Sequence, residues 1–254
     1  MIKIENISKK FGNHIVLDKL NLEIKDGETL VIIGRSGCGK SVLLKHIVGL
    51  LIPDNLDAKV IVDGVNITKL TWKELNEIRN KFGVVFQGGA LFDSLSVGEN
   101  VGFKYLEYSN IPRDELYKKV EEALHLVDLS GIQNVLPSEL SGGMRKRAAL
   151  ARAICLKPEI ILYDEPTTGV DPITADSINE LIRSMHDQLK VTSIVVTHDM
   201  VSAYKIADRI VMLYKGKIIA EGTPREIQNT THPVVKQFIT GSSHGPITET
   251  IDGF

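Results

Sequence analysis

The sequence predicts an α/β fold with a mostly parallel central sheet. The run Thr29–Ile33 is apolar on both faces, as in a central parallel strand, and a Gly-rich turn and a helical pattern follow it. Apolar runs return at Ile160–Tyr163, Thr192–Thr197 and Ile210–Tyr214, with a helical stretch from Ile173 to Lys190 between them. Strands that alternate with helices in this way are typical of a parallel sheet.

The N-terminal part of the chain predicts an antiparallel β-layer. Alternate residues of Leu20–Ile24 are apolar, up to a turn at Asp26–Gly27, and the later string VIVDGVNI is typical of a hairpin. Helical periodicity then covers Arg113–Val127 and Met144–Ile154. We therefore expect a helical subdomain inserted at about residues 88–152.

Composition and charge limit the possible function classes. The 254 residues include 43% hydrophobic and 24% charged side chains, which is typical of a globular protein of one or two domains. A net charge of −2, from 30 basic and 32 acidic residues, gives no overall positive field to attract nucleic acid. Two cysteines, Cys38 and Cys155, are too few for a disulfide framework or a paired zinc site and favour a reducing cytoplasm.

No apolar run approaches the roughly 20 residues that cross a bilayer, and the N-terminus lacks the apolar region of a secretory signal. We therefore expect a chain that does not itself span a membrane. Any transport role then lies with partner subunits that supply the spanning helices.

The string GRSGCGKS, residues Gly34–Ser41, fits the pattern G-x-x-x-x-G-K-[ST] between a buried strand and a helix. Glycines at 34, 37 and 39 allow tight turns that point backbone N–H groups at phosphate oxygens, aided by the positive end of the helix. Lys40 is expected to contact the β- and γ-phosphates, and Ser41 offers a hydroxyl to Mg²⁺. The alternative is a Gly-rich turn with an exposed lysine.

In the string IILYDEP, two adjacent carboxylates, Asp164 and Glu165, stand at the end of an apolar strand. Open α/β sheets bind ligands at that edge. We expect Asp164 to reach the Mg²⁺ shell and Glu165 to orient and polarise the attacking water. Taken alone, an Asp-Glu pair is more often a solvated strand end.

The string LSGGM, residues Leu140–Met144, predicts a second anion cradle. Ser141 is a capping residue, Gly142 and Gly143 permit close backbone approach, and a helix with three basic residues follows. The alternative for the pentapeptide alone is an ordinary helix N-cap.

The string Gly34–Ser41, called the phosphate loop from here on, is followed by LSGGM and then by ILYDEP. In this order the three motifs resemble the nucleotide-binding domains of ABC transporters, over about Ile2 to Thr223. The resemblance implies a P-loop NTPase (RecA-like) core within an ATP-binding domain at 1–240, with ATP and Mg²⁺ as cofactors. By the same resemblance, Phe11 stacks on adenine, Gln87 senses Mg²⁺ and the membrane partner, and His198 faces the γ-phosphate.

The implied site residues fall into three groups. Lys40, Glu165 and His198 are the catalytic residues, and Ser41, Gln87 and Asp164 reach the metal. The implied nucleotide-binding residues are Phe11, Gly34, Arg35, Ser36, Gly37, Cys38, Gly39, Lys40, Ser41, Val42, Gln87, Ser141, Gly142, Gly143 and Asp171.

The resemblance also implies a head-to-tail homodimer with two ATP sites. In the family, the LSGG segment of one subunit covers the ATP on the phosphate loop of the other, and Asp171 matches the aspartate of the dimer-crossing loop. The tail at 241–254 is rich in Gly, Ser and Thr, which predicts disorder, but its apolar residues Ile247, Ile251 and Phe254 offer a way to dock on a neighbouring subunit.

Four stretches further resemble the ATPases of Mla/Mce-type lipid transport systems: GRSGCGKSVLLKHIVGLL, VVFQGGALFDSLSVGENVGF, LSGGMRKRAALARAI and YDEPTTGVDPITADSI. Met144 stands where ABC domains usually carry Gln. The resemblance implies a peripheral ATPase on the cytoplasmic face of the inner membrane. Its partners would be permease subunits that move phospholipid or another hydrophobic substrate, with a STAS-domain protein and an Mce-domain protein alongside.

Three alternatives stay open. They are the ATPase of a polar amino-acid importer, a soluble ABC ATPase that works on DNA or ribosomes, and a subunit that binds ATP without hydrolysing it. The second class carries a long coiled-coil insertion or two such domains in one chain, which this sequence does not show. The residues Lys40, Asp164, Glu165 and His198 argue against the third.

Overall fold

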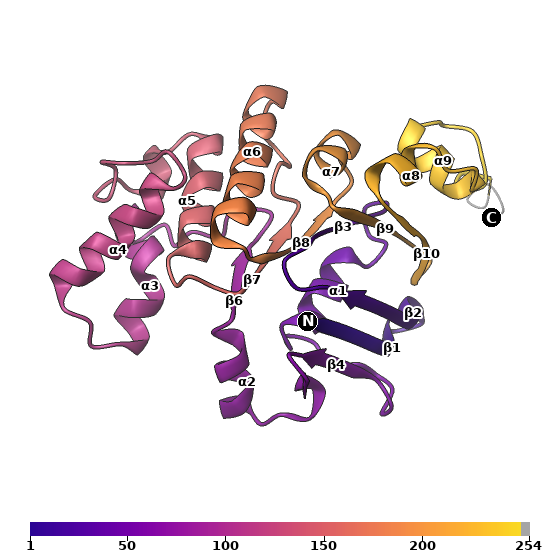
Figure 1. Cartoon of the computed structure of the whole chain (residues 1–254), viewed down its shortest axis with the longest axis horizontal. Helices are drawn as coiled ribbons and strands as arrows, with labels where there is room; N and C mark the ends of the chain where they lie inside the picture. The colour runs from indigo at the N-terminus through magenta and orange to yellow at the C-terminus, as the bar shows by residue number, and fades with distance from the viewer. Residues whose placement is uncertain (250–254) are drawn as a thin grey trace. The chain divides into compact units, whose positions relative to one another are not determined.

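The computed structural model describes residues 1–249 and divides into two compact units. Unit 1 combines Met1–Leu75 with Val196–Phe254, and unit 2 is Asn76–Val195. The division passes through the helix α2 (Trp72–Arg79) and the strand β8 (Thr192–Thr197). Figure 1 labels most of the helices and strands of both units along the chain.

Unit 1 contains the antiparallel layer that the alternating N-terminal pattern predicts. Its strand order is β2-β1-β4-β5, and Ile2 on β1 pairs with Ile24 on one side and with Val62 on the other. Alternate apolar side chains, Ile2 and Ile4 among them, are buried, as the period of two requires. The strands are β1 (Ile2–Phe11), β2 (His14–Ile24), β4 (Lys59–Val62) and β5 (Val65–Asn66).

A second group of strands in unit 1 carries the phosphate loop. β3 (Thr29–Ile33) is buried at all five positions and pairs in parallel with β9 (Arg209–Tyr214), and β10 (Lys217–Gly222) pairs with β9 in the antiparallel direction. The helix α7 packs against β3, and α8 packs against β9 and β10. The helical elements of this unit, besides the start of α2, are α1 (Lys40–Ile47), η1 (Ile67–Lys69), α7 (Met200–Ile206), α8 (Pro224–Gln228) and α9 (Pro233–Thr240).

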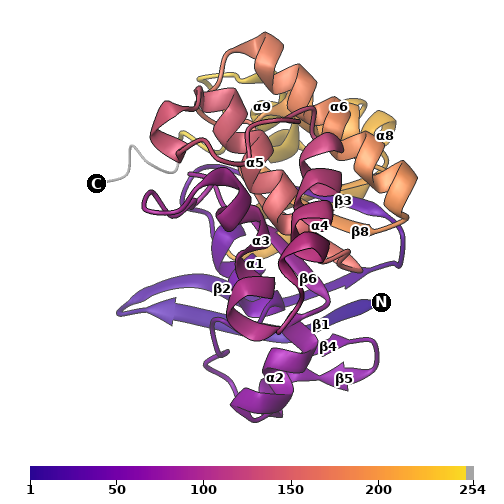
Figure 2. The ribbon, with the colours of Figure 1, turned by 90° about the vertical axis from the view of Figure 1, so that its left-hand side faces the viewer.

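Unit 2 is a helical group around parallel strands, seen in another orientation in Figure 2. β6 (Phe82–Val85) pairs in parallel with β7 (Ile160–Asp164). The central helix α5 contacts three other helices and β6, and its buried alanines, such as Ala148 and Ala151, allow neighbours to approach closely. The helices are α3 (Val97–Tyr108), α4 (Arg113–His125), η2 (Pro137–Glu139), α5 (Gly142–Ile154) and α6 (Pro172–Leu189).

These elements confirm the predicted fold class, with the antiparallel layer, the parallel pairs and the helical insert all present. Two helix boundaries differ by two residues. The helix expected from Met144 starts at Gly142, because Ser141 caps it and the two glycines form its first turn. The helix expected to reach Val127 ends at His125, before the turn at Asp128, which has a positive φ of 55°.

Residues 242–249 pack on their own chain through the buried side chain of Gln237 on α9. The Gln237 Oε1 atom accepts from the N–H of Ile247 at 2.7 Å, and its Nε2 donates to the Ser242 carbonyl at 3.2 Å and the Thr248 hydroxyl at 3.1 Å. Ile247 is therefore buried within its own subunit. The other tail residues expected to dock on a neighbour, Ile251 and Phe254, lie outside the described residues, so docking of the tail stays a prediction.

Candidate functional site

The phosphate loop in unit 1 follows β3 and ends at the start of α1. Gly34 and Gly39 both have positive φ, 154° and 106°. A Cβ atom on Gly34 would lie 2.5 Å from the carbonyl oxygen of Leu213, and one on Gly39 would lie 2.8 Å from Val16 Cγ1. The loop therefore needs glycine at both ends for conformation and for space.

Lys40 is buried and its ammonium lies over the loop. Its Nζ atom donates to the carbonyl oxygens of Gly34 at 2.8 Å and Arg35 at 3.2 Å. The first turn of α1 contains no acidic residue, so the partial positive charge of the helix start adds to that of the lysine. Ser41 and Val42 occupy this same first turn. The arrangement favours a bound anion, as phosphate recognition requires.

Phe11 ends β1 with half of its surface exposed. The Nζ atom of Lys9 lies 5.8 Å from the centroid of the Phe11 ring. That ammonium is itself fixed by Asp54 Oδ1 at 2.6 Å and by the carbonyl of Ile52 at 2.9 Å. One face of the aromatic ring is thus held by a cation, which leaves the ring suited to stacking.

His198 directly follows β8, and Asp199 separates it from the first residue of α7. Asp199 caps that helix by accepting from the N–H of Val201 at 3.0 Å, and its own N–H donates to the hydroxyl of Thr197 at 3.0 Å. Since α7 packs against β3, the strand that leads into the phosphate loop, His198 belongs to the same part of unit 1 as the loop.

Asp164 is the last residue of β7 in unit 2, and Glu165 follows it directly. Glu165 is 7% exposed and has a left-handed backbone, with φ of 50°. A non-glycine residue in that conformation costs about 1–3 kcal/mol and persists only where its surroundings hold it. Its Oε2 atom accepts from the hydroxyl of Thr168 at 3.2 Å. The Glu165 carbonyl also accepts from the N–H of Thr168 at 3.2 Å, so Thr168 contacts both the backbone and the side chain of Glu165.

Ser141–Gly143 and Asp171 are joined in unit 2 by Thr174. A Cβ atom on Gly143 would lie 2.7 Å from Thr174 Cγ2, so the start of α5 touches this residue. The hydroxyl and the N–H of Thr174 donate to the carboxylate of Asp171, at 2.5 and 3.0 Å, and these bonds hold the pKa of Asp171 below its usual value. Thr174 therefore links the predicted cradle, Ser141–Gly143, to Asp171, the aspartate expected at the dimer-crossing loop.

Gln87 follows β6, and its carbonyl oxygen accepts from the Nζ atom of Lys146 on α5. The pKa of Lys146 is lowered by burial, while the negative charge of Glu165 acts in the opposite direction. Sequence reasoning missed this contact, because it placed the basic residues after LSGGM in the anion cradle. Burial of the Lys146 side chain distinguishes it from the neighbouring basic residues, and the helical pattern of the sequence does not predict that burial.

The structure thus gathers the predicted residues into two sets. Unit 1 holds Phe11, Gly34–Val42 and His198, and unit 2 holds Gln87, Ser141–Gly143, Asp164, Glu165 and Asp171. Across residues 1–249, no three His, Cys, Asp or Glu side chains cluster so that they could hold a metal by themselves. In the same range, no helix has the length and apolar character needed to cross a membrane.

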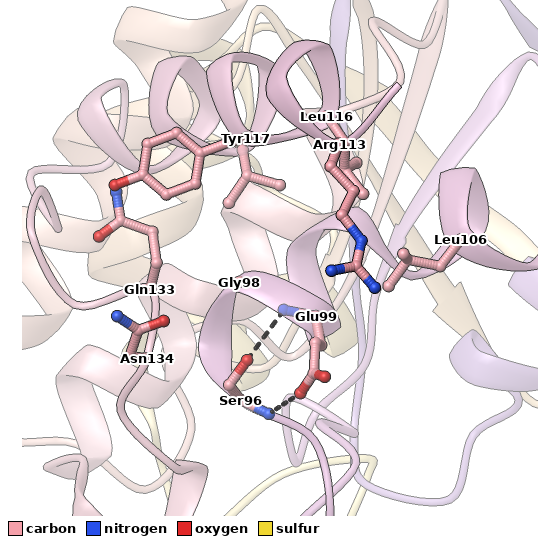
Figure 3. Close-up of a pocket in the computed structure, with 10 residues that line it drawn as sticks. Ser96, Gly98, Glu99, Leu106, Arg113, Leu116, Tyr117, Gln133 and Asn134 are labelled. Atoms are coloured by element: carbon pink, nitrogen blue, oxygen red, sulfur yellow. Dashed lines mark hydrogen bonds between the residues drawn. The ribbon is translucent and has the colours of Figure 1, made fainter. Parts of the chain in front are cut away.

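A separate pocket of about 370 Å³ lies in unit 2 between α3, α4 and the segment that contains Gln133. Figure 3 shows Ser96 and Glu99 at this pocket, bonded to each other as a capping box, with distances of 2.7 and 3.2 Å. Leu106, Leu116 and others supply an apolar lining. None of the lining residues belongs to the predicted site.

Comparison with known proteins gives close relatives over almost the whole chain. "Intermembrane phospholipid transport system ATP-binding protein MlaF" of Haemophilus influenzae is 42% identical over 247 residues, covering 97% of this chain and 93% of its own. "Protein TRIGALACTOSYLDIACYLGLYCEROL 3, chloroplastic" of Arabidopsis thaliana is 42% identical, with 97% and 75% covered. "Probable ribonucleotide transport ATP-binding protein mkl" of Mycobacterium leprae is 41% identical, with 97% and 70% covered.

Solved structures show the same fold. The ATP-binding cassette MJ0796, solved as a dimer in a post-hydrolysis state bound to ADP and Pi, is 35% identical and superimposes with a TM-score of 0.81 over 89% of this chain and 99% of its own. The family model described as "ABC transporter" matches residues 17–168. The chain therefore belongs to the ABC transporter family, as one of its ATP-hydrolysing subunits.

Proposed function

We propose that this chain powers the transport of phospholipid, or another hydrophobic substrate, through partner permease subunits. The observation that carries the proposal is the 42% identity to a phospholipid transport ATPase over 97% of the chain. Met144, which stands where ABC domains usually carry Gln, supports the same subfamily. A ribonucleotide substrate is the second candidate, because a relative of 41% identity carries that name.

The nucleotide in this proposal is ATP, held by unit 1. Phe11 stacks on adenine, since its ring is half exposed and backed by Lys9. The loop from Gly34 to Val42 surrounds the phosphates, and Lys40 neutralises charge on the β- and γ-phosphates. The buried ammonium over the loop carbonyls supports this role.

Mg²⁺ suits the residues expected to reach it, because Ser41, Gln87 and Asp164 each offer an oxygen, the ligand type that this ion prefers. When bound, Mg²⁺ would neutralise the charge of the phosphate oxygens.

Glu165 orients and polarises the attacking water, and His198 faces the γ-phosphate. The restrained backbone of Glu165 supports its role, since water activation requires a carboxylate at a fixed position. Replacing a general base usually lowers turnover by about 10²–10⁴. Glu165→Gln should therefore bind ATP as the unmodified chain does and lose most of its phosphate release. Hydrolysis by Glu165→Gln at the unmodified rate would contradict the assignment.

The working unit in this proposal is a head-to-tail homodimer with two ATP sites. Ser141, Gly142 and Gly143 of one subunit cover the ATP on the phosphate loop of the other, and Asp171 lies at the crossing point. The exposure of Ser141 and Gly142 at the start of a helix supports the arrangement, as does the dimeric structure of a 35% identical relative. Docking of the tail on the neighbouring subunit is proposed through Ile251 and Phe254, because Ile247 is buried within its own subunit.

The permease subunits are expected to carry the substrate, with a STAS-domain protein and an Mce-domain protein as further partners. The chain is then peripheral, on the cytoplasmic face of the inner membrane, and contacts no nucleic acid. The conformational change that accompanies opening of the dimer after hydrolysis is transmitted to the permease through the loop that contains Gln87.

Substrate class is tested by purifying the chain in detergent together with the products of its neighbouring genes. We expect phospholipid in the extracted complex and higher ATPase activity in phospholipid vesicles than in detergent. A complex without bound lipid, stimulated by ribonucleotide or by amino acid, would contradict the lipid proposal. The Glu165→Gln complex serves as the control for contaminating ATPases.

A further inference from the structure

The buried side chain of Gln133 lines one side of the pocket between α3 and α4. Gln133 is 8% exposed, and the pocket has a volume of about 370 Å³. The side-chain amide makes no hydrogen bond to any of residues 1–249. A buried amide is costly unless it has a hydrogen-bond partner, so we expect a molecule in the pocket to supply one.

Two glycines on α3 bring the walls of the pocket together. A Cβ atom on Gly98 would lie 3.0 Å from the Gln133 carbonyl oxygen, and one on Gly102 would lie 2.9 Å from Leu116 Cδ1 on α4. The two glycines are four residues apart, so they lie on one face of α3. The N–H of Gly98 also donates to the Gln133 carbonyl at 2.8 Å. This face of α3 therefore holds both Gln133 and α4 in place around the pocket.

Two side chains of opposite charge, Arg113 on α4 and Glu99 on α3, lie on the other side of the pocket (Figure 3). Within residues 1–249, the Arg113 guanidinium forms no ion pair and no hydrogen bond. The Glu99 Oε2 atom accepts from the Ser96 N–H at 2.7 Å, and this bond lowers the pKa of Glu99. The pocket therefore presents a cation and an anion that do not neutralise each other.

Apolar side chains form the rest of the lining. Leu106 of α3 is 49% exposed, and Leu116 and Val120 of α4 complete the apolar wall. An apolar group placed against this wall leaves water, which favours binding. Sites for small molecules have volumes of about 300–1,000 Å³ and combine an apolar lining with a few polar groups. The pocket has both properties.

We propose that this pocket binds a small zwitterion with an apolar body and a further polar group. The anionic group lies at Arg113, the cationic group lies at Glu99, and the polar group at the far end bonds the Gln133 amide. Two sources supply this chemistry: a free aromatic amino acid with a ring hydroxyl, and a single-chain phospholipid with a phosphoethanolamine head. The inference goes beyond the proposed function and does not depend on it, because the pocket shares no residue with the predicted nucleotide site.

Binding is measured by ligand-observed NMR with the full-length chain in the absence of nucleotide. Tyrosine represents the amino-acid source, and hexanoyl lysophosphatidylethanolamine below its micelle concentration represents the lipid source. We expect at least one of them to bind with a dissociation constant of about 10 µM to 1 mM, which is consistent with a ligand of this size. Tyramine lacks the carboxylate, and hexanoyl lysophosphatidylglycerol lacks the ammonium. Each should bind about tenfold more weakly than its parent, because a charge-assisted hydrogen bond is lost.

Variants of the two charged residues test whether the ligand lies in this pocket. Arg113→Gln and Glu99→Gln each remove one charge, and the amide oxygen in Glu99→Gln can still accept from the Ser96 N–H. Each variant should weaken binding of the zwitterion by about tenfold. Arg113→Gln should leave the weak binding of tyramine unchanged, because tyramine has no anionic group. Lys118→Gln, at an exposed position of α4 outside the lining, is the matched control.

Gln133→Leu tests the role of the buried amide. Tyrosine should bind the unmodified chain about 2- to 10-fold more tightly than phenylalanine, which lacks the ring hydroxyl, and Gln133→Leu should remove most of that difference. For the lipid source, the same comparison uses the lysolipid with and without its free glycerol hydroxyl. If Gln133→Leu does not fold, the variants at the exposed residues Arg113 and Glu99 still provide the test.

Absence of binding by both compounds would overturn the proposal. So would binding that is as tight in folded Arg113→Gln and Glu99→Gln as in Lys118→Gln, or single-charge analogues that bind as tightly as their parents. Binding of only one of the two compounds supports the proposal and identifies the source of the ligand.

Discussion

The contact between Gly143 and Thr174 predicts a large effect from adding one methyl group. In Gly143→Ala the new Cβ would lie 2.7 Å from Thr174 Cγ2, well inside contact distance, whereas in Gly142→Ala the nearest atom is Val170 Cγ1 at 3.9 Å. Both substitutions replace glycine at the first turn of α5, so their effects on helix propensity are similar and largely cancel in a comparison. The difference between the two variants therefore reports the steric contact.

Overpacking of this kind costs about 1–3 kcal/mol. At about 2–4 °C per kcal/mol for a chain of this size, Gly143→Ala should melt about 2–12 °C below Gly142→Ala. The same displacement moves the hydroxyl of Thr174 away from Asp171, to which it donates at 2.5 Å. We therefore also expect weaker ATP-dependent dimerisation, measured by light scattering in the Glu165→Gln background.

A second substitution identifies the cause. Thr174→Ser removes the Cγ2 atom and keeps the hydroxyl, so Thr174→Ser combined with Gly143→Ala should recover most of the lost melting temperature and dimerisation. The reasoning is refuted if Gly143→Ala and Gly142→Ala melt at the same temperature. It is also refuted if the double variant is as unstable as Gly143→Ala alone.

Two further predictions follow from contacts outside the cradle. Asp54→Asn should raise KM for ATP by about two- to fivefold and leave kcat unchanged, because Lys9 is then held less firmly against the Phe11 ring. The size of the effect follows from the free energy that an exposed cation–π contact contributes. Asp57→Asn, which leaves Lys9 untouched, is the control in the ATPase assay, and equal KM values for the two variants would count against the idea. Cys155 is buried, and burial raises the pKa of its thiol from 9.0 to about 11. As pH rises, the thiol therefore loses its proton in the unfolded chain before it does so in the folded chain. The free energy of unfolding should fall by about 3 kcal/mol between about pH 9 and pH 11. Urea unfolding of Cys155→Ala should lack this part of the pH dependence, and parallel losses in both proteins would rule it out.

The phosphate loop and the end of β7 could be predicted from the sequence because their signals are local. A strand apolar on both faces, three glycines and a Lys-Ser pair define the loop within a dozen residues. The structure places β3, the loop and α1 in that order, and Asp164 at the end of β7. Local spacing was sufficient for these parts.

The contacts that support the site could not be read in this way. Lys146 follows LSGGM as the second of three basic residues, and its sequence neighbours give no sign that it turns to a carbonyl 59 positions earlier. The bond between Lys9 and Asp54 spans 45 positions. Side-chain periodicity identifies which face of a helix is buried, but not which distant backbone group a buried cation meets.

The C-terminal tail shows a different limit. Its composition predicts disorder, yet residues 242–249 are held on α9 by Gln237, whose amide bonds three different residues. A single buried side chain with well-placed partners can order a segment that has little apolar content of its own.

The way Gln237 binds the tail determines where the chain can be shortened without side effects. A cut after Gly241 would remove Ser242, Ile247 and Thr248 together, and would leave a buried amide with none of these three partners. Loss of dimerisation in such a truncated protein would then mix damage to α9 with loss of a contact between subunits. A cut after Glu249 keeps all three partners of the Gln237 amide, so it isolates what the last five residues contribute.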